Sequence, residues 1–205
     1  IRDGERSRGL GDVYKRQAVL VSGTGRNLAA LIAAIEAGEV KARIVKVISN
    51  RPGVRALEIA ADAGIPVQVI NHREYETRAA FDAALACGIE DADADAVILA
   101  GFMRILTAEF VQRYTGHMLN IHPSLLPLYT GLRTHERALE DGQSHHGVSV
   151  HFVTPELDGG PVIKQGRLTI HPEDTAESLA ARVFHEIEEK LYPEVIGWLA
   201  SGKLE

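Results

Sequence analysis

The sequence predicts an open α/β fold, in which a mostly parallel sheet carries helices on both faces. From residue 18 onward, short runs rich in Val and Ile alternate with longer amphipathic stretches, a pattern typical of repeated β-α-β units. Glycines follow several of the amphipathic stretches and mark their ends. A strand candidate at residues 118–121 runs directly into the polar sequence His122-Pro123-Ser124. Because ligands of open sheets bind at such carboxyl ends, we expect the functional site there.

The first half of the chain predicts four strands linked by helices. Residues 18–22 form the first strand, and a helix follows in which apolar residues recur at helical spacing, namely Leu28, Leu31, Ile32 and Ile35. Gly38 ends this helix. The remaining strands are expected at residues 42–49, 66–70 and 96–99. The helices between them are expected at residues 55–63, before Gly64, and at residues 74–87, before Gly88.

The second half begins with a helix at residues 107–114 and the strand at 118–121. Val148, Val150 and Phe152, and then Val162, Lys164 and Gln165, suggest two strands. The Pro- and Gly-rich turn 154–161 would join them, so that they extend the sheet like a hairpin. Residues 175–200 predict a long terminal helix with Thr175 as its N-cap and Ser178 in place of the usual acidic partner. Pro193 is expected to kink or break this helix.

Composition narrows the class of function. A chain of 205 residues with 45% hydrophobic residues is long enough for one compact domain. The net charge of −6 disfavours a general nucleic-acid binder, so we expect small-molecule substrates, with monomer or homodimer left open. Cys87 is the only cysteine, which excludes an internal disulfide and a CxxC metal knuckle and fits a reducing cytoplasm. No apolar run approaches the roughly 20 residues of a membrane-spanning helix.

Residues 1–17 differ from the rest of the chain. They are rich in charge and glycine and have no sustained helix or strand period. We expect them to be either a disordered leader or sequence foreign to the gene, and we favour the second. The predicted domain therefore covers residues 18–205.

A glycine loop joins the first predicted strand to the first helix. In Ser22-Gly23-Thr24-Gly25-Arg26-Asn27, backbone N–H groups and the helix dipole would point at a ligand above the turn, as in a phosphate cradle. Leu28 replaces the third glycine of the dinucleotide fingerprint, and the Lys-Ser/Thr pair of a P-loop is missing. A tight turn without a ligand remains the alternative.

Asn120, His122 and Asp158 form the candidate catalytic group. Asn120 and His122 are two residues apart on a strand, so both side chains project to the same face. An amide and an imidazole suit the stabilisation of an oxyanion and proton transfer. Asp158 lies in a turn with two glycines that leaves its carboxylate free to meet and favour a charged imidazole. The alternative is that Asn120 caps a loop, His122 fills a polar gap and Asp158 is an Asx-turn residue.

Two long segments that contain these residues resemble the signature of the folate-dependent formyltransferases. They are NIHPSLLPLYTGLRTHERALEDG, from Asn120, and HHGVSVHFVTPELDGGPVI, from His145. The segments SGTGRNLAALI, ISNRPGVRALEIAADAGIPV and ILAGFMRIL are similar to the branch of that family that acts on glycinamide ribonucleotide, so the likeness covers residues 18–202. The resemblance implies a Rossmann-like sheet of the formyltransferase fold. It also implies one-carbon transfer from 10-formyltetrahydrofolate to the amine of the nucleotide in purine biosynthesis, without a metal.

The resemblance implies roles for individual residues. Asn120, His122 and Asp158 would be catalytic, and Gly25, Arg26 and Asn27 would hold the substrate phosphate. Arg26 departs from the family, in which many members carry a small polar residue such as Ser.

The terminal helix and the loops supply the other residues implied by the resemblance. An acidic residue near the substrate amine would be Glu188, if its position is counted back from the sequence Leu-Tyr-Pro. Counting forward from Asp158 gives a position one residue away. Glu189 occupies the position at which the family commonly has His. A cis bond is implied before Pro127. His135 and His151 match family positions near the site without an assigned step. The folate site would comprise Arg78, Met103, Arg104, Ile105, Leu106 and Asn120, with backbone groups near Asp158 against the pterin.

We therefore expect the neutral substrate amine to attack the formyl carbon while His122 and Asn120 stabilise the oxyanion. The alternatives are a formyltetrahydrofolate hydrolase or a folate- or nucleotide-binding module without turnover. The hydrolase usually carries an additional N-terminal regulatory domain, which 17 residues could not form. Synthesis of formyl-methionyl-tRNA would need a second C-terminal domain and a basic face.

Overall fold

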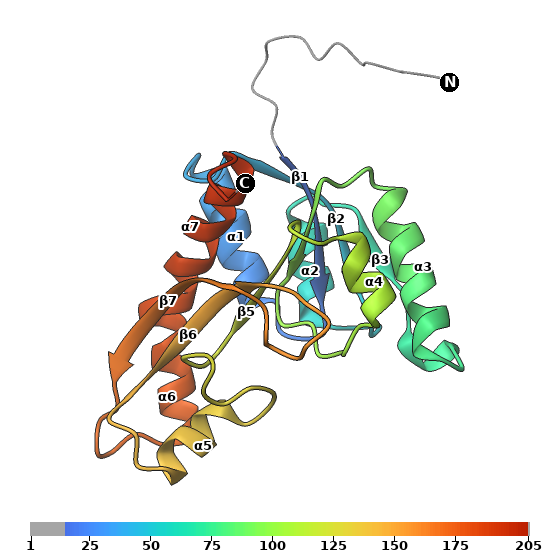
Figure 1. Ribbon diagram of the computed structural model, residues 1–205. Coiled ribbons are helices and arrows are strands. Elements are labelled where there is room, and N and C mark those ends of the chain that lie inside the picture. The colour runs from blue at the N-terminus through green and yellow to red at the C-terminus, as the bar shows by residue number, and fades with distance from the viewer. Residues whose placement is uncertain (1–14, 205) are drawn as a thin grey trace.

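The computed structural model describes residues 15–204, which form one seven-stranded sheet with helices packed on it (Figure 1). The strands are β1 Lys15–Val21, β2 Ala42–Ser49, β3 Val67–Val69, β4 Ala96–Leu99, β5 Met118–His122, β6 His145–Phe152 and β7 Val162–Thr169. The helices are α1 Arg26–Glu36, α2 Arg55–Asp62, η1 His72–Glu74, α3 Arg78–Glu90, α4 Ala108–Arg113, α5 Thr134–Glu140, α6 Ala176–Val183, η2 Phe184–Glu188 and α7 Glu189–Ala200. No helix within these residues is both long enough and apolar enough to cross a membrane.

The sheet is mostly parallel, as predicted. Its strand order is β3-β2-β1-β4-β5-β6-β7, and the first five strands in this order pair in parallel. β6 pairs antiparallel with β5 and β7 pairs antiparallel with β6, so the predicted hairpin-like extension is confirmed. Chain order reverses between β1 and β4, and the loops after these two strands therefore open a crevice at the carboxyl edge.

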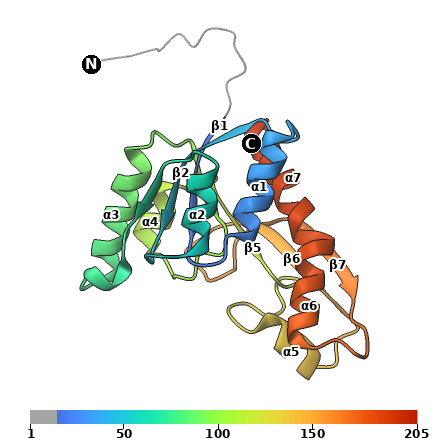
Figure 2. The same cartoon turned by 180° about the vertical axis from the view of Figure 1, so that it is seen from behind.

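Helices cover both faces of the sheet (Figures 1 and 2). Alternate residues of β1 point to opposite faces: Val19 and Val21 pack in the core under α1, α2, α6 and α7. Ala18 and Leu20 pack in the second core, under α3 and α4. The central parallel strands β1, β4 and β5 are largely buried on both sides, which explains their nearly continuous apolar sequence.

β1 begins at Lys15, three residues before the predicted boundary of the domain. Lys15, Arg16 and Gln17 pair with residues 42–44 of β2. The Arg16 side chain donates hydrogen bonds to the carbonyl oxygens of Asp93 and Ala92, both at 2.6 Å. The sequence predicts that Lys15, Arg16 and Gln17 belong to the leader, but these contacts hold them in the sheet. The prediction about residues 1–14 lies outside the described residues.

The helix predicted at residues 74–87 differs at both ends. It starts at Arg78, because the Thr77 hydroxyl accepts a hydrogen bond from Ala80 N and caps it. It continues through Gly88 to Glu90, so Gly88 does not end it. A Cβ on Gly88 would lie 3.0 Å from Gln68 Oε1 and 3.2 Å from Ile70 Cδ1, which indicates close packing of helix and sheet. α5 has no counterpart among the predicted helices.

The long terminal helix is interrupted, but not at Pro193. Thr175 and Ser178 form the predicted capping box of α6. The irregularity is η2, a π-helical turn at Phe184–Glu188, and Pro193 lies inside α7. A π-turn contains one residue more than an α-turn, so this turn can accommodate one additional residue before Glu189. The predicted break at Pro193 is therefore wrong.

Candidate active site

The glycine loop between β1 and α1 lies at the carboxyl edge of the sheet. Gly25 has a φ of 76°, and a Cβ there would lie 2.7 Å from the backbone Cα of Ala56, so the loop packs directly on α2. The Ser22 hydroxyl accepts a hydrogen bond from Met103 N at 2.8 Å and donates one to Asn50 Oδ1 at 2.6 Å. These bonds tie the loops after β1, β2 and β4 together.

A cavity of about 410 Å³ opens above this loop. Its wall comes from the β1–α1 loop, the segments after β4 and β5, α5, and the terminal helices: residues 22–27, Arg51, Ala100, Gly101, Met103, Ile121, Pro123, His135, Ala180, Phe184 and Glu188. The residues predicted to bind phosphate, Gly25, Arg26 and Asn27, are all in the wall. The cavity extends from the glycine loop to Ile121 and Pro123 at the carboxyl end of β5, but its wall does not include Asn120, His122 or Asp158.

Glu188 brings a carboxyl group into the same cavity. Asn27 Nδ2 donates a hydrogen bond to Glu188 Oε2 at 2.8 Å. Burial raises the pKa of Glu188, and this bond together with the positive charge of Arg26 opposes that rise. One turn later, the buried Tyr192 hydroxyl donates to the carbonyl oxygens of Leu99 at 2.7 Å and Leu119 at 3.3 Å, which fixes α7 to the sheet.

The structure brings Asn120, His122 and Asp158 together. His122 Nδ1 lies 3.5 Å from Asp158 Oδ2, a distance of ion pairing rather than of a short hydrogen bond. The same carboxylate oxygen accepts a hydrogen bond from Gly131 N at 2.8 Å. Asp158 has a φ of 51° in its turn, a conformation that Asp tolerates better than most residues. Their catalytic roles remain a prediction.

His151 joins this group, although the sequence analysis assigned it no chemical step. It lies opposite Asn120 in the β5–β6 register, and Asn120 Nδ2 is 3.2 Å from its Nε2. His151 Nδ1 is 2.9 Å from Phe152 O, so a neutral ring with its proton on Nδ1 can accept the Asn120 amide. Burial lowers the pKa of His151 and favours this neutral form. Strand pairing, which brings residues 31 positions apart into contact, provides this link.

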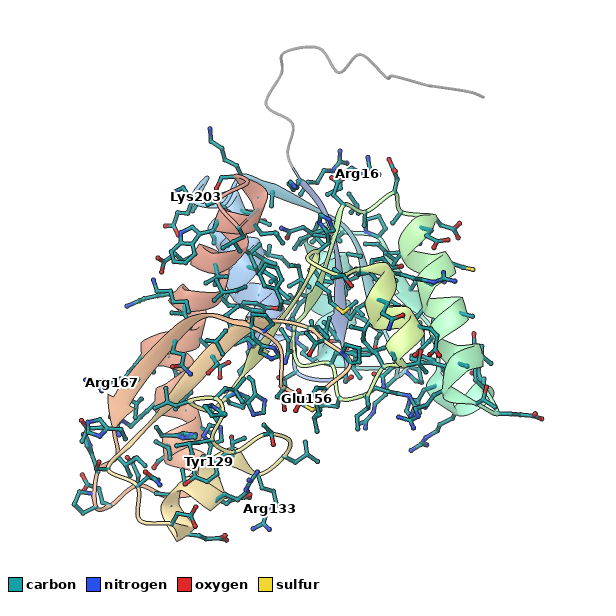
Figure 3. The ribbon with its side chains drawn as sticks, viewed as in Figure 1. Arg16, Tyr129, Arg133, Glu156, Arg167 and Lys203 are labelled. Carbon is teal, nitrogen blue, oxygen red and sulfur yellow. The ribbon has the colours of Figure 1, made fainter. Side chains whose placement is uncertain are left out.

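The loop after the Pro-rich segment covers His122. His122 Nε2 lies 2.8 Å from Tyr129 O, so this backbone carbonyl occupies the second ring nitrogen. Tyr129 and Arg133 have φ values of 58° and 57°, a backbone conformation that is uncommon outside glycine. Figure 3 shows these two residues in the segment next to α5, with Glu156 in the β6–β7 connection nearby. The predicted cis bond, Leu126–Pro127, is confirmed.

The residues predicted to bind folate are only partly collected in one place. Met103 and Ile105 are exposed, at 61% and 53%, in the loop after β4, and Met103 also reaches the cavity. The Arg104 guanidinium lies 5.2 Å from the Phe81 ring centroid. Leu106 packs in the core under α3 and α4, so its side chain supports the loop. Arg78 is exposed at the first turn of α3.

Two further histidines lie beside the cavity. His135 Nδ1 and His146 Nε2 are 3.1 Å apart. Burial lowers the pKa of each to about 4, and the positive charge of Arg26 contributes to the shift at His135. Both rings are therefore neutral at physiological pH. Within residues 15–204, no cluster of three or more His, Cys, Asp or Glu side chains is arranged to bind a metal ion.

Comparison with known protein families gives the family of this chain. The family model described as formyl transferase matches residues 15–196. The chain belongs to the formyl transferase family. The match to this family includes the glycine loop, Asn120, His122, Asp158 and Glu188.

Relatives within the formyl transferase family are similar over most of the chain. Phosphoribosylglycinamide formyltransferase of Escherichia coli (strain K12) is 47% identical over 186 residues, which are 91% of this chain and 87% of the relative. The solved structure of phosphoribosylglycinamide formyltransferase from Coxiella burnetii has a TM-score of 0.89 at 49% identity, covering 93% of this chain and 89% of that one. The human trifunctional purine biosynthetic protein adenosine-3 is 46% identical over 190 residues, 93% of this chain but 19% of that protein.

Proposed function

We propose that this formyl transferase transfers the formyl group of 10-formyltetrahydrofolate to the amine of N1-(5-phospho-D-ribosyl)glycinamide in purine biosynthesis. The observation that carries the proposal is the single cavity that joins a glycine loop at a helix N-terminus, the carboxyl of Glu188 and the end of β5. A phosphate suits the glycine loop, because free N–H groups and the helix dipole favour an anion there. The relatives named phosphoribosylglycinamide formyltransferase support the same substrate.

The reaction exchanges one C–N bond for another. The substrate nitrogen forms a bond to the formyl carbon, and the bond between that carbon and N10 of the folate breaks. One proton leaves the amine and one proton reaches N10. Glu188 lies in the same cavity as the glycine loop, and its carboxylate would orient the amine and accept its proton.

Asn120, His122 and Asp158 act on the formyl oxygen and the transferred proton. Asn120 Nδ2 has two N–H bonds, and its contact with His151 uses one of them. The other is available for the oxyanion of the tetrahedral intermediate. Asp158 Oδ2, 3.5 Å from His122 Nδ1, orients the imidazole of His122. Donation from His122 Nε2 to the formyl oxygen would replace its contact with Tyr129 O.

The folate part of the proposal rests on the loop after β4. Exposed Met103 and Ile105 offer apolar surface to the flat rings of the donor. Arg104 in the same loop and exposed Arg78 supply positive charge. Backbone groups near Asp158 would bind the pterin. The proposal includes small-molecule substrates only, since a net charge of −6 disfavours nucleic-acid phosphate. It places a monomer or homodimer in the cytoplasm, a compartment in which free Cys87 stays reduced.

One assay separates this function from its alternatives. The purified protein is mixed with a 10-formylfolate donor, with and without the nucleotide, and the deformylated folate is followed by absorbance. Release that requires the nucleotide supports the transferase. Release without the nucleotide would indicate a hydrolase, and binding of both ligands without release would indicate a binding module.

Glu188→Gln tests the role of the carboxyl group. Gln keeps the size and can still contact Asn27, but it cannot accept a proton. We expect kcat to fall by roughly 100-fold, as for loss of a general base. Because burial raises the pKa of Glu188, the acid limb of the wild-type pH–rate profile should lie above pH 4.5 and vanish in the variant. Arg113→Ala, which removes an exposed ion pair with Glu90, serves as the control. Equal kcat for Glu188→Gln and wild type would exclude the proposed role.

A further inference from the structure

Arg26 is the first residue of α1, and its guanidinium lies in the wall of the cavity. The guanidinium carbon is 4.5 Å from the centroid of the Phe184 ring. Its charge also contributes to the lowered pKa of His135 and opposes the rise in the pKa of Glu188. Among residues 15–204, no side chain or carbonyl forms a hydrogen bond or ion pair with this guanidinium. Its five N–H donors are therefore available to a ligand.

Arg26 places its positive charge at the N-terminus of α1, where the carboxyl of Glu188 interacts with it. The N-terminus of a helix carries a partial positive charge, which repels a cation in the first turn. The neighbouring His135 is kept neutral, and the carboxyl of Glu188 is bound to Asn27. A phosphate dianion in the cavity would offset both positive charges, and a planar guanidinium matches two phosphate oxygens.

Phe184 comes from the other side of the cavity. It is the first residue of η2, the π-helical turn, and it is 4% exposed. The wider turn accommodates one extra residue before Glu189. The first residue of α1 and the first residue of the π-helical turn, which are far apart in the sequence, are thus in direct contact.

We propose that Phe184 is a positioning residue for the substrate phosphate: its ring holds the Arg26 guanidinium in the cavity, where it binds the phosphomonoester together with the backbone of the glycine loop. This inference rests on the proposed function for the identity of the phosphorylated substrate. An exposed arginine otherwise samples many rotamers, and stacking on an aromatic ring reduces that freedom before the ligand binds. Phe184 therefore affects the affinity for the phosphate group and not the chemistry at the formyl carbon.

The test compares Phe184→Leu, Arg26→Ser and the double variant. Binding of ribose 5-phosphate is measured by calorimetry, and kcat and both KM values are measured in the transfer assay. We expect Arg26→Ser to raise the Kd of ribose 5-phosphate by on the order of 10-fold, as for a charge-assisted hydrogen bond. Phe184→Leu should raise it about threefold, as for an exposed cation–π contact. In both variants the KM of the nucleotide rises, while kcat and the KM of the folate stay within about twofold.

Controls distinguish positioning from loss of packing. Phe110→Leu makes the same change at a residue that is 3% exposed, in α4 on the other face of the sheet, and should leave ribose 5-phosphate binding unchanged. Phe184→Tyr retains the aromatic ring and should bind ribose 5-phosphate with the wild-type Kd. Arg26→Lys keeps the charge but loses the planar group, so it should raise the Kd of ribose 5-phosphate about as much as Phe184→Leu does. It therefore provides the same test if Phe184→Leu folds poorly.

The double variant decides the question. If Phe184 acts through Arg26, adding Phe184→Leu to Arg26→Ser causes no further loss of phosphate affinity. Additive losses, or an unchanged Kd for both Phe184→Leu and Arg26→Lys, would overturn the inference. A different outcome would separate the two proposals. If neither the wild type nor any variant transfers formyl groups, but ribose 5-phosphate binding still depends on Arg26 and Phe184, the proposed function is wrong and the phosphate site is supported.

Discussion

Gly25→Ala should destabilise the protein and weaken the nucleotide site at the same time. The substitution carries two costs. The φ of 76° places a Cβ in the left-handed region, which costs about 1–2 kcal/mol. The new Cβ would also lie 2.7 Å from Ala56 Cα, and since a backbone atom cannot move aside as a side chain does, relieving the contact costs about 1–3 kcal/mol more. Together the free energy of unfolding should fall by roughly 3 kcal/mol.

The opposite end of the same helix provides a matched control. Gly38 follows α1, has a φ of 75°, and its added Cβ would meet nothing within 4 Å. Gly38→Ala therefore carries only the backbone cost of about 1–2 kcal/mol. The difference between the two variants isolates the contact between the glycine loop and α2.

Urea denaturation gives the two free energies, and steady-state kinetics gives the KM of the nucleotide. For Gly25→Ala we expect KM to rise by roughly 10-fold or more, because a misplacement of about 1 Å at a site can cost two orders of magnitude. Gly38→Ala should leave KM unchanged. Equal destabilisation by both substitutions, or an unchanged KM for Gly25→Ala, would refute the argument that close packing on Ala56 sets the shape of the loop.

Three further predictions follow from the buried hydrogen bonds and histidines. Tyr192→Phe leaves the carbonyl of Leu99 without its donor and should lower the free energy of unfolding by about 1–3 kcal/mol in urea; wild-type stability would contradict the anchoring role. His151→Leu removes the acceptor for Asn120 and should lower kcat by roughly 10- to 100-fold with little change in either KM, whereas unchanged kcat would show that Asn120 needs no support. Burial lowers the pKa of His146 to about 4, so the unfolded chain binds more protons than the folded protein between pH 6.5 and about 4. Stability should fall as pH falls through that window, and a titration of unfolding free energy with His146→Gln should show a flatter slope.

The regular part of the fold was readable in the sequence because hydrophobic period and burial agree there. The strands at residues 42–49 and 96–99 were predicted with the bounds that the structure has, since both are rich in Val and Ile that are mostly buried in the sheet. The failures have local causes. Gly88 looked like a helix end, but it lies where α3 packs against β2 and β3 and only a small residue fits. The short α5 begins after Arg133 in a left-handed conformation, with no side-chain cap to mark it.

The sequence by itself determined the chemistry that is present: the glycine loop, the pair Asn120 and His122 on one strand face, and a carboxylate in the Asp158 turn. These are short-range patterns, fixed by a period of two along a strand or by turn-forming residues. Only the tertiary structure decided which groups meet. It placed His151 against Asn120 through strand pairing and Phe184 against Arg26 through a π-turn. Such contacts depend on register and on the packing of distant elements, which local sequence does not specify.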